Sequence, residues 1–96
     1  MYASIRRHVV HRDSFEEIER QINEGFVPIL RSIPGFVAYY LVNTGNGIAI
    51  SVSIFEDQVG AEQSAASARD YIKENLAPLF SNPPEIMDGR VIVKAL

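Results

Sequence analysis

The most regular alternation of apolar and polar residues lies at positions 48–55. Four branched aliphatic residues there alternate with two serines, an alanine and a phenylalanine: Ile48, Ile50, Val52 and Ile54 against Ala49, Ser51, Ser53 and Phe55. This period of two predicts a strand, because successive side chains of a strand point to opposite faces of the sheet. We expect the wholly aliphatic face to be the one that the helices of the chain cover.

A second β-rich run, residues 36–42, precedes this strand, and the residues between them, 43–47, are rich in Asn and Gly. Glycine and asparagine accept the positive φ angles that tight hairpin turns require. The two runs therefore predict an antiparallel hairpin.

The register of the hairpin decides whether Tyr39 or Tyr40 points toward the helices. A two-residue loop at 45–46 would pair Val52 with Tyr39, whereas a three-residue loop would pair it with Ala38 and send Tyr40 inward. A slip of one residue reverses the faces. Both alternatives stay open from the sequence, and an inward tyrosine would be either an aromatic core residue or a contact for a phenolic ligand.

A helix is predicted to begin near Ser14, since Ser14 and Glu17 have the spacing of a capping box. Apolar residues then recur every three or four positions, at Phe15, Ile18, Ile22, Phe26, Ile29 and Ile33. This spacing is typical of an amphipathic helix with one buried face. Gly25 and Pro28 interrupt the pattern, so we expect a kink or break near Gly25.

A second helix is predicted after Asp57, which is the expected N-cap. Its inward residues are mostly small: Ala61, Ala65, Ala68, Ile72 and Leu76. Such an alanine seam either lets the helix approach the sheet closely or leaves room there for a ligand.

The first and last strands of the chain are predicted at residues 2–10 and 85–95, with a bulge at Gly89. The resulting order, β-α-β-β-α-β, predicts one α+β domain over residues 1–96 with a ferredoxin-like fold. Both helices should lie on one face of a four-stranded antiparallel sheet. The other face would be open, and it would carry Tyr2, His8, Val10, Ala49, Phe55, Ile92 and either Phe36 or Tyr40. This set is too apolar to be left wholly in water, so we expect the face to form a homodimer.

Composition narrows the function classes. The 96 residues carry a net charge of −3, which does not fit a nucleic-acid-binding protein, and they include no cysteine. No run reaches the roughly 18 apolar residues of a membrane span, and the first ten residues do not form a signal peptide. We expect a cytoplasmic protein without disulfides.

The chain resembles the antibiotic biosynthesis monooxygenase-like group of the dimeric α+β barrel superfamily. The resemblance is carried by the ferredoxin-like order, by Pro34-Gly35-Phe36 at the start of the second strand, and by residues 51–65. It implies a homodimer with a pocket in each subunit between sheet and helices. Some members oxidise polycyclic phenols with O₂ and no prosthetic group, and others degrade haem, using Trp, Asn and His or Tyr residues. This chain has no Trp.

The candidate pocket residues are Arg7, His8, Tyr39, Tyr40, Ala65 and Ala68. Arg7 shares the predicted helix-facing side of the first strand, where it needs a carboxylate partner or an anionic ligand. His8 has the pKa range of a general base, but its parity points it away from the helices, toward the dimer face. His11 would point opposite to His8, so the two predict no metal site.

Two functions of different class follow. One is a monooxygenase without prosthetic group or other cofactor, acting on a small hydrophobic aromatic or enolisable substrate, as the resemblance implies. The alternative is a non-catalytic module that binds a small molecule or serves dimerisation, since no strong catalytic motif is present.

Overall fold

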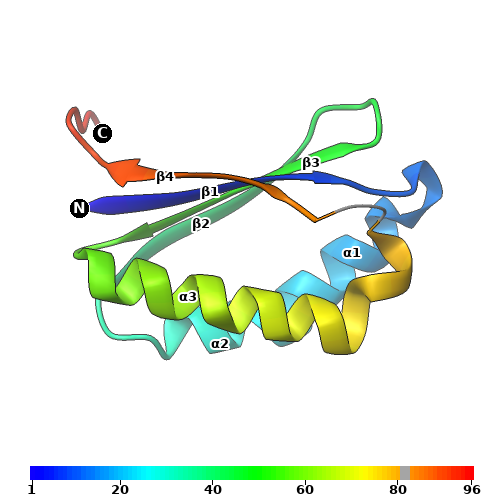
Figure 1. Cartoon of the computed structure of the whole chain (residues 1–96), viewed down its shortest axis with the longest axis horizontal. Coiled ribbons are helices and arrows are strands. Elements are labelled where there is room, and N and C mark those ends of the chain that lie inside the picture. Colours follow the sequence, from blue (N-terminus) through cyan, green and yellow to red (C-terminus); the bar gives the residue numbers. More distant parts are fainter. Residues whose placement is uncertain (81–82) are drawn as a thin grey trace.

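The predicted arrangement of strands and helices is confirmed. The computed structural model describes residues 1–80 and 83–96, and in them four strands form one antiparallel sheet in the order β2-β3-β1-β4. The strands are β1 (Tyr2–Val9), β2 (Phe36–Asn43), β3 (Ile48–Phe55) and β4 (Glu85–Arg90). All helices of the described residues lie on one side of this sheet, and none of them covers the other side (Figure 1). This is the ferredoxin-like α+β fold.

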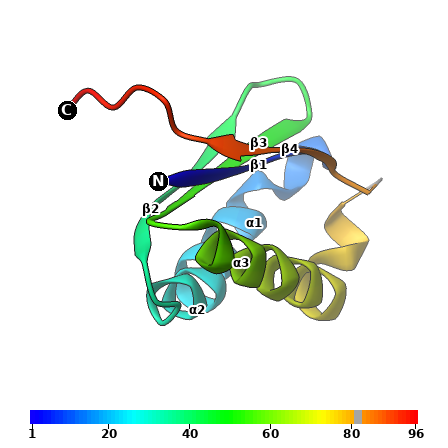
Figure 2. The ribbon, with the colours of Figure 1, turned by 60° about the vertical axis from the view of Figure 1, so that its left-hand side comes forward.

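The helical layer consists of two long helical segments that run side by side under the sheet (Figure 2). The first contains α1 (Phe15–Gln21), a π-helical turn (Ile22–Phe26) and α2 (Val27–Arg31). The second contains α3 (Gln58–Tyr71), another π-helical turn (Ile72–Leu76) and a short 3₁₀ turn (Ala77–Leu79). Within the described residues, no helix combines the length and the hydropathy that crossing a bilayer requires.

The predicted assignment of the two sheet faces is wrong. Ala49, Ser51, Ser53 and Phe55 are buried toward the helices, whereas their aliphatic neighbours Ile48, Ile50, Val52 and Ile54 are only partly buried on the open side. β1 follows the same parity, so Ser4 and His8 are buried and Arg7 is exposed. The period of two distinguishes the faces but does not say which one the helices cover.

A close contact at the start of α3 shows which face of β3 the helices cover. A Cβ on Gly60 would lie 2.8 Å from Cδ1 of Phe55, so the helix backbone packs directly against the Phe55 ring. Ala61, the next residue, is 2% exposed. The absence of a side chain at Gly60 therefore lets α3 lie close to the Phe55 face of the sheet.

The register of the hairpin differs from both alternatives. Val52 pairs with Tyr40 and Ser53 pairs with Tyr39, while the Thr44 amide donates to the Ile48 carbonyl at 3.2 Å. Tyr39 consequently points toward the helices, and Tyr40 is 62% exposed on the open side. The register shifts between Phe36 and Ala38, which marks a bulge at the start of β2.

The first helical segment is continuous, because a π-helical turn takes the place of the predicted kink. Ser14 forms no side-chain cap bond, so the predicted capping box is absent. Leu30 is fully buried, while Ile29, which the stripe placed inward, is 38% exposed. In α3 the predicted cap is confirmed: the Asp57 carboxylate accepts from the Gly60 amide at 3.0 Å.

The last strand is shorter than predicted. It ends at Arg90, and Gly89 pairs with Ala3 in an uninterrupted register rather than at a bulge. Residues 91–96 form no strand in the structure, and Ile92 is 82% exposed beyond the sheet. The strand stops there because β1, its pairing partner, begins at Tyr2.

Candidate functional site

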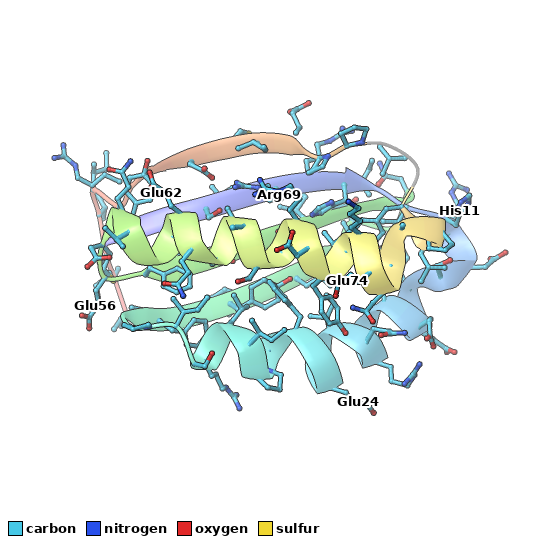
Figure 3. The ribbon with its side chains drawn as sticks, turned by 60° about the horizontal axis from the view of Figure 1, so that its bottom comes forward. His11, Glu24, Glu56, Glu62, Arg69 and Glu74 are labelled. Carbon is cyan, nitrogen blue, oxygen red and sulfur yellow. The ribbon has the colours of Figure 1, made fainter. Side chains whose placement is uncertain are left out.

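A cavity of about 290 Å³ lies between the helix-facing side of the sheet and the helices. β1, β3 and β2 form its roof, and α1, α3 and the turn after α3 form its walls; Figure 3 views the molecule from the helical side. Its volume is close to the lower limit of typical small-molecule sites. Its lining includes Arg6, His8, Tyr39, Ala65, Ala68, Arg69, Lys73 and Phe80.

His8 contributes the most unusual polar group of the cavity lining. The residue is 5% exposed, and its Nδ1 is buried without a hydrogen-bond partner in the part of the chain that the structure describes. The imidazole packs against the ring of Phe80, with 4.8 Å between the centroids. Burial, assisted by the positive charge of Arg6, lowers the pKa of His8 to about 4. The imidazole is therefore neutral near pH 7 and can accept a hydrogen bond from a ligand.

Arg6 lies two residues before His8 on the same face of β1. Its guanidinium pairs with the carboxylate of Asp88 on β4 and also donates to the Ile5 carbonyl at 3.0 Å. The Arg6 side chain is 12% exposed, so this cation is held in a fixed position beside the cavity. A charge held in this way stabilises an anion in the cavity without having to reorganise.

Tyr39 places a phenol on the β2 side of the cavity. Its ring packs edge-on against Phe26 at a centroid distance of 5.8 Å. Burial raises the pKa of Tyr39 above its usual range, so the hydroxyl stays protonated and can donate.

Small side chains on α3 make the space. Ala65 and Ala68 line the cavity. The buried Ser64 hydroxyl donates a hydrogen bond to the Ala61 carbonyl at 2.7 Å. Tyr71 braces this wall against the first helical segment by donating to the Gln21 carbonyl at 2.8 Å. Gly25 accommodates that tyrosine, because a Cβ there would lie 2.1 Å from the Tyr71 hydroxyl oxygen.

The structure brings together four of the six residues proposed from the sequence. His8, Tyr39, Ala65 and Ala68 line the cavity. Arg7 and Tyr40 do not, because both belong to the opposite parity of their strands and are exposed on the other side of the sheet. The expectation that His8 points away from the helices is wrong for the same reason.

Sequence reasoning missed Arg6, Arg69, Lys73 and Phe80. With the faces assigned as the structure has them, the alternation of β1 would have placed Arg6 beside His8. Phe80 follows the short 3₁₀ turn Ala77–Leu79 and carries no periodic signal, so only the fold brings it to His8.

A second hollow, of about 590 Å³, runs along the edge strand β2 beside α1 and α2. Its charged lining residues, Glu16, Glu19 and Arg31, are all exposed. No buried polar side-chain atom without a partner lies in it among the described residues. The chemistry therefore concentrates at the smaller cavity beside His8. Across the described residues, no cluster of three His, Cys, Asp or Glu side chains is placed to hold a metal ion.

Comparison with known proteins gives matches at the level of structure. No protein-family model matches the sequence, and no curated protein matches it. A monooxygenase from ActVA-Orf6 of Streptomyces coelicolor, solved in complex with the ligand nanaomycin D, is 16% identical, with a TM-score of 0.75 over 99% of this chain and 90% of that one. The heme-degrader MhuD from Mycobacterium tuberculosis, solved with two hemes bound in its active site, is 14% identical, with a TM-score of 0.75 over 99% of each chain.

A protein from Nitrosomonas europaea, described as a candidate antibiotic biosynthesis monooxygenase, is 15% identical and has a TM-score of 0.75 over 97% of this chain and 100% of that one. At such identities the likeness concerns the fold, which extends over nearly the whole length in all three cases. The chain thus has the fold of the antibiotic biosynthesis monooxygenase-like proteins, as its sequence predicted.

Proposed function

We propose that this chain is a homodimeric monooxygenase that acts, without a prosthetic group, on a small aromatic or enolisable substrate held in the cavity beside His8. The observation that carries the proposal is the buried Nδ1 of His8, a ring nitrogen without a hydrogen-bond partner among the described residues, on a residue that lines a cavity with apolar walls. A buried acceptor of this kind is costly unless a ligand satisfies it.

In the proposed complex, Nδ1 of His8 accepts the hydrogen bond of a phenol or enol hydroxyl. The hydroxyl then transfers its proton to Nδ1 of His8, whose proton affinity rises as the neighbouring negative charge develops, while Arg6 and the Tyr39 hydroxyl stabilise the anion. The apolar walls keep water from competing for these interactions.

The activated anion then reacts with O₂ directly. For a substrate with an acidic CH₂ group, one oxygen atom forms a carbonyl at that carbon and the other leaves as water with the two hydrogens. The substrate supplies all the electrons, so this reaction requires no external reductant. The neighbour solved with nanaomycin D supports the choice of an aromatic substrate class by analogy.

The low pKa of His8 favours one competing function, which is binding without chemistry. A neutral imidazole whose pKa is about 4 is a good hydrogen-bond acceptor and a weak base. In that case the chain would hold a phenolic ligand and leave it unchanged.

Dithranol, a tricyclic phenol with an activated CH₂ group, distinguishes the two functions. Binding is measured under argon by fluorescence, and O₂ consumption is then measured in air against the protein-free rate. We expect the wild type to accelerate oxidation and His8→Phe to reduce that acceleration by about 100-fold, the usual contribution of a positioned acid or base. Gln63→Ala, on the exposed surface of α3, is the matched control.

Each outcome has a separate meaning. Binding without acceleration would favour the non-catalytic module, and acceleration that survives in His8→Phe would move the chemistry away from this cavity. A wild type that neither binds nor oxidises the probe would contradict the proposed function.

A further inference from the structure

The charged residues that line the cavity are all basic. Arg6, Arg69 and Lys73 line it, and no Asp or Glu does. The chain as a whole has the opposite balance, with 12 acidic and 9 basic residues. The positive character of this site is therefore local and does not reflect the composition of the chain.

Among the described residues, only one of the three cations is paired with a carboxylate. Arg6 pairs with Asp88, whereas no ion pair within residues 1–80 and 83–96 includes Arg69 or Lys73. In the first helical segment, by contrast, Arg20 lies between Glu17 and Glu24 and pairs with both. These two unpaired cations belong to the second helical segment, Arg69 to α3 and Lys73 to the π-helical turn after it.

Arg69 and Lys73 are also placed so that their positive charges act on the same region. They are four residues apart on consecutive turns of one helical segment and therefore on the same side of it. Figure 3 shows Arg69 at the edge of α3 that lies toward β1. Both residues are exposed, so they stand at the rim of the cavity, while His8 is buried inside it. Like charges at this spacing weaken a helix, so the pair does not serve the stability of α3.

We propose that the ligand of this site is an aromatic acid, with its hydroxyl at His8 and its carboxylate between Arg69 and Lys73 at the rim. The ring system would occupy the apolar space beside Ala65 and Ala68. Two-point recognition of this kind fixes the orientation of the ring, because the hydroxyl and the carboxylate have different partners. The inference rests on the proposed binding site, and it does not require the oxidation step.

Three matched probes test it: 6-hydroxy-2-naphthoate, its neutral methyl ester, and 2-naphthol. Dissociation constants are measured by fluorescence at pH 7 for the wild type, for the double variant Arg69→Gln/Lys73→Gln and for the control Arg20→Gln. We expect the wild type to bind the acid about tenfold more tightly than either neutral probe, as charge-assisted hydrogen bonds at a half-exposed site would give. The double variant should lose that preference and keep its affinity for 2-naphthol, while Arg20→Gln changes neither.

Salt gives a second readout. Raising the ionic strength from about 0.01 M to 1 M shortens the Debye length from about 30 to 3 Å, which should remove most of the preference for the acid and leave 2-naphthol binding unchanged. If the double variant folds poorly, the single variants Arg69→Gln and Lys73→Gln are measured in its place. Arg69→Lys should keep part of the preference for the acid that Arg69→Gln loses.

The failure of this inference is distinguishable from that of the proposed function. Equal affinity of the wild type for the acid and the neutral probes, with both weakened in His8→Phe, would overturn the carboxylate site and leave the cavity intact. A preference for the acid that persists in the double variant would overturn it as well. If the wild type binds none of the probes, the binding site itself is contradicted.

Discussion

The two faces of β3 differ in chemistry in a way that reverses the usual expectation for a sheet. The face toward the helices carries Ala49, Ser51, Ser53 and Phe55, and the open face carries three isoleucines and a valine. A sheet packed only against its own helices would place the aliphatic residues inward. The difference suggests separate roles, in which the inner face leaves space for a ligand and the outer face supports assembly.

The large core residues follow the same division. Leu76, Leu30 and Ile18 are fully buried and come from the helical segments, and Phe55 lies at the end of β3. The middle of the inner face is occupied by small and polar side chains around His8. Packing among the helices therefore supplies most of the apolar burial, and the strand centres contribute little to it.

The largest expected effect is a difference in stability between a substitution in the core and a substitution beside the cavity. Leu76→Ala should lower the free energy of unfolding by about 2–5 kcal/mol, as truncation of a fully buried leucine does. Ser53→Ala, on the inner face of β3, should change it by less than about 1 kcal/mol, because it removes no packed aliphatic group. Urea denaturation of the two variants measures both. Equal losses would mean that the serine face is part of the structural core.

A charge on the open face should act on assembly. Val52 lies between Ile5 and Tyr40 in the middle of that face. Val52→Lys should raise the dissociation constant of the proposed dimer by about 100-fold, or about 3 kcal/mol, because an unpaired charge would be buried in the contact. Sedimentation velocity measures this change, and Gln63→Lys on the exposed surface of α3 is the control. A monomeric wild type at micromolar concentration would contradict assembly through this face.

The stability of the folded chain should depend on pH through His8, which lies on the inner face of the sheet. The pKa of His8 is lowered from 6.5 to about 4, so below pH 6.5 the unfolded chain takes up a proton that the folded chain does not. The stability should consequently fall as the pH decreases from about 6.5 to 4, by about 2 kcal/mol once access of water to the site is considered. Urea denaturation across this range measures the loss.

His8→Phe should remove this part of the pH dependence, whereas His11→Gln, at an exposed histidine, should retain it. A wild-type profile that coincides with that of His8→Phe would mean that His8 is not desolvated in the folded protein.

The sequence predicted several of the features that local signals determine, although two of them, the Ser14 capping box and the bulge at Gly89, are absent from the structure. The strand-helix order, the hairpin and the Asp57 cap depend on residues close together in the chain, and each was predicted correctly. The choice of inner face could not be predicted, since alternation in β3 is compatible with either side facing the helices. That single choice exchanged Arg7 for Arg6 and reversed the expected orientation of His8.

The register of the hairpin had a similar effect on the tyrosines. Val52 pairs with Tyr40 and faces the open side, so the combination of register and face makes Tyr39 the inward residue. Arg69, Lys73 and Phe80 come to the cavity through the docking of α3 and the loop after it, which no local pattern encodes. A Gly-Ala pair at the start of a predicted helix, as in Gly60-Ala61, would have been the best available indication of where α3 touches the sheet.

The π-helical turn between α1 and α2 has a consequence for how periodicity is interpreted. The buried residues of this segment are Ile18, Ile22, Phe26 and Leu30, each four positions after the one before. In a regular α-helix each step of four overshoots a full rotation by about 40°, so three steps would carry the stripe about 120° around the axis. The wider turn absorbs this angular drift and keeps Leu30 in line with Ile18. Consecutive steps of four can therefore be a sequence signature of a widened turn, and here they would have selected Leu30 over Ile29.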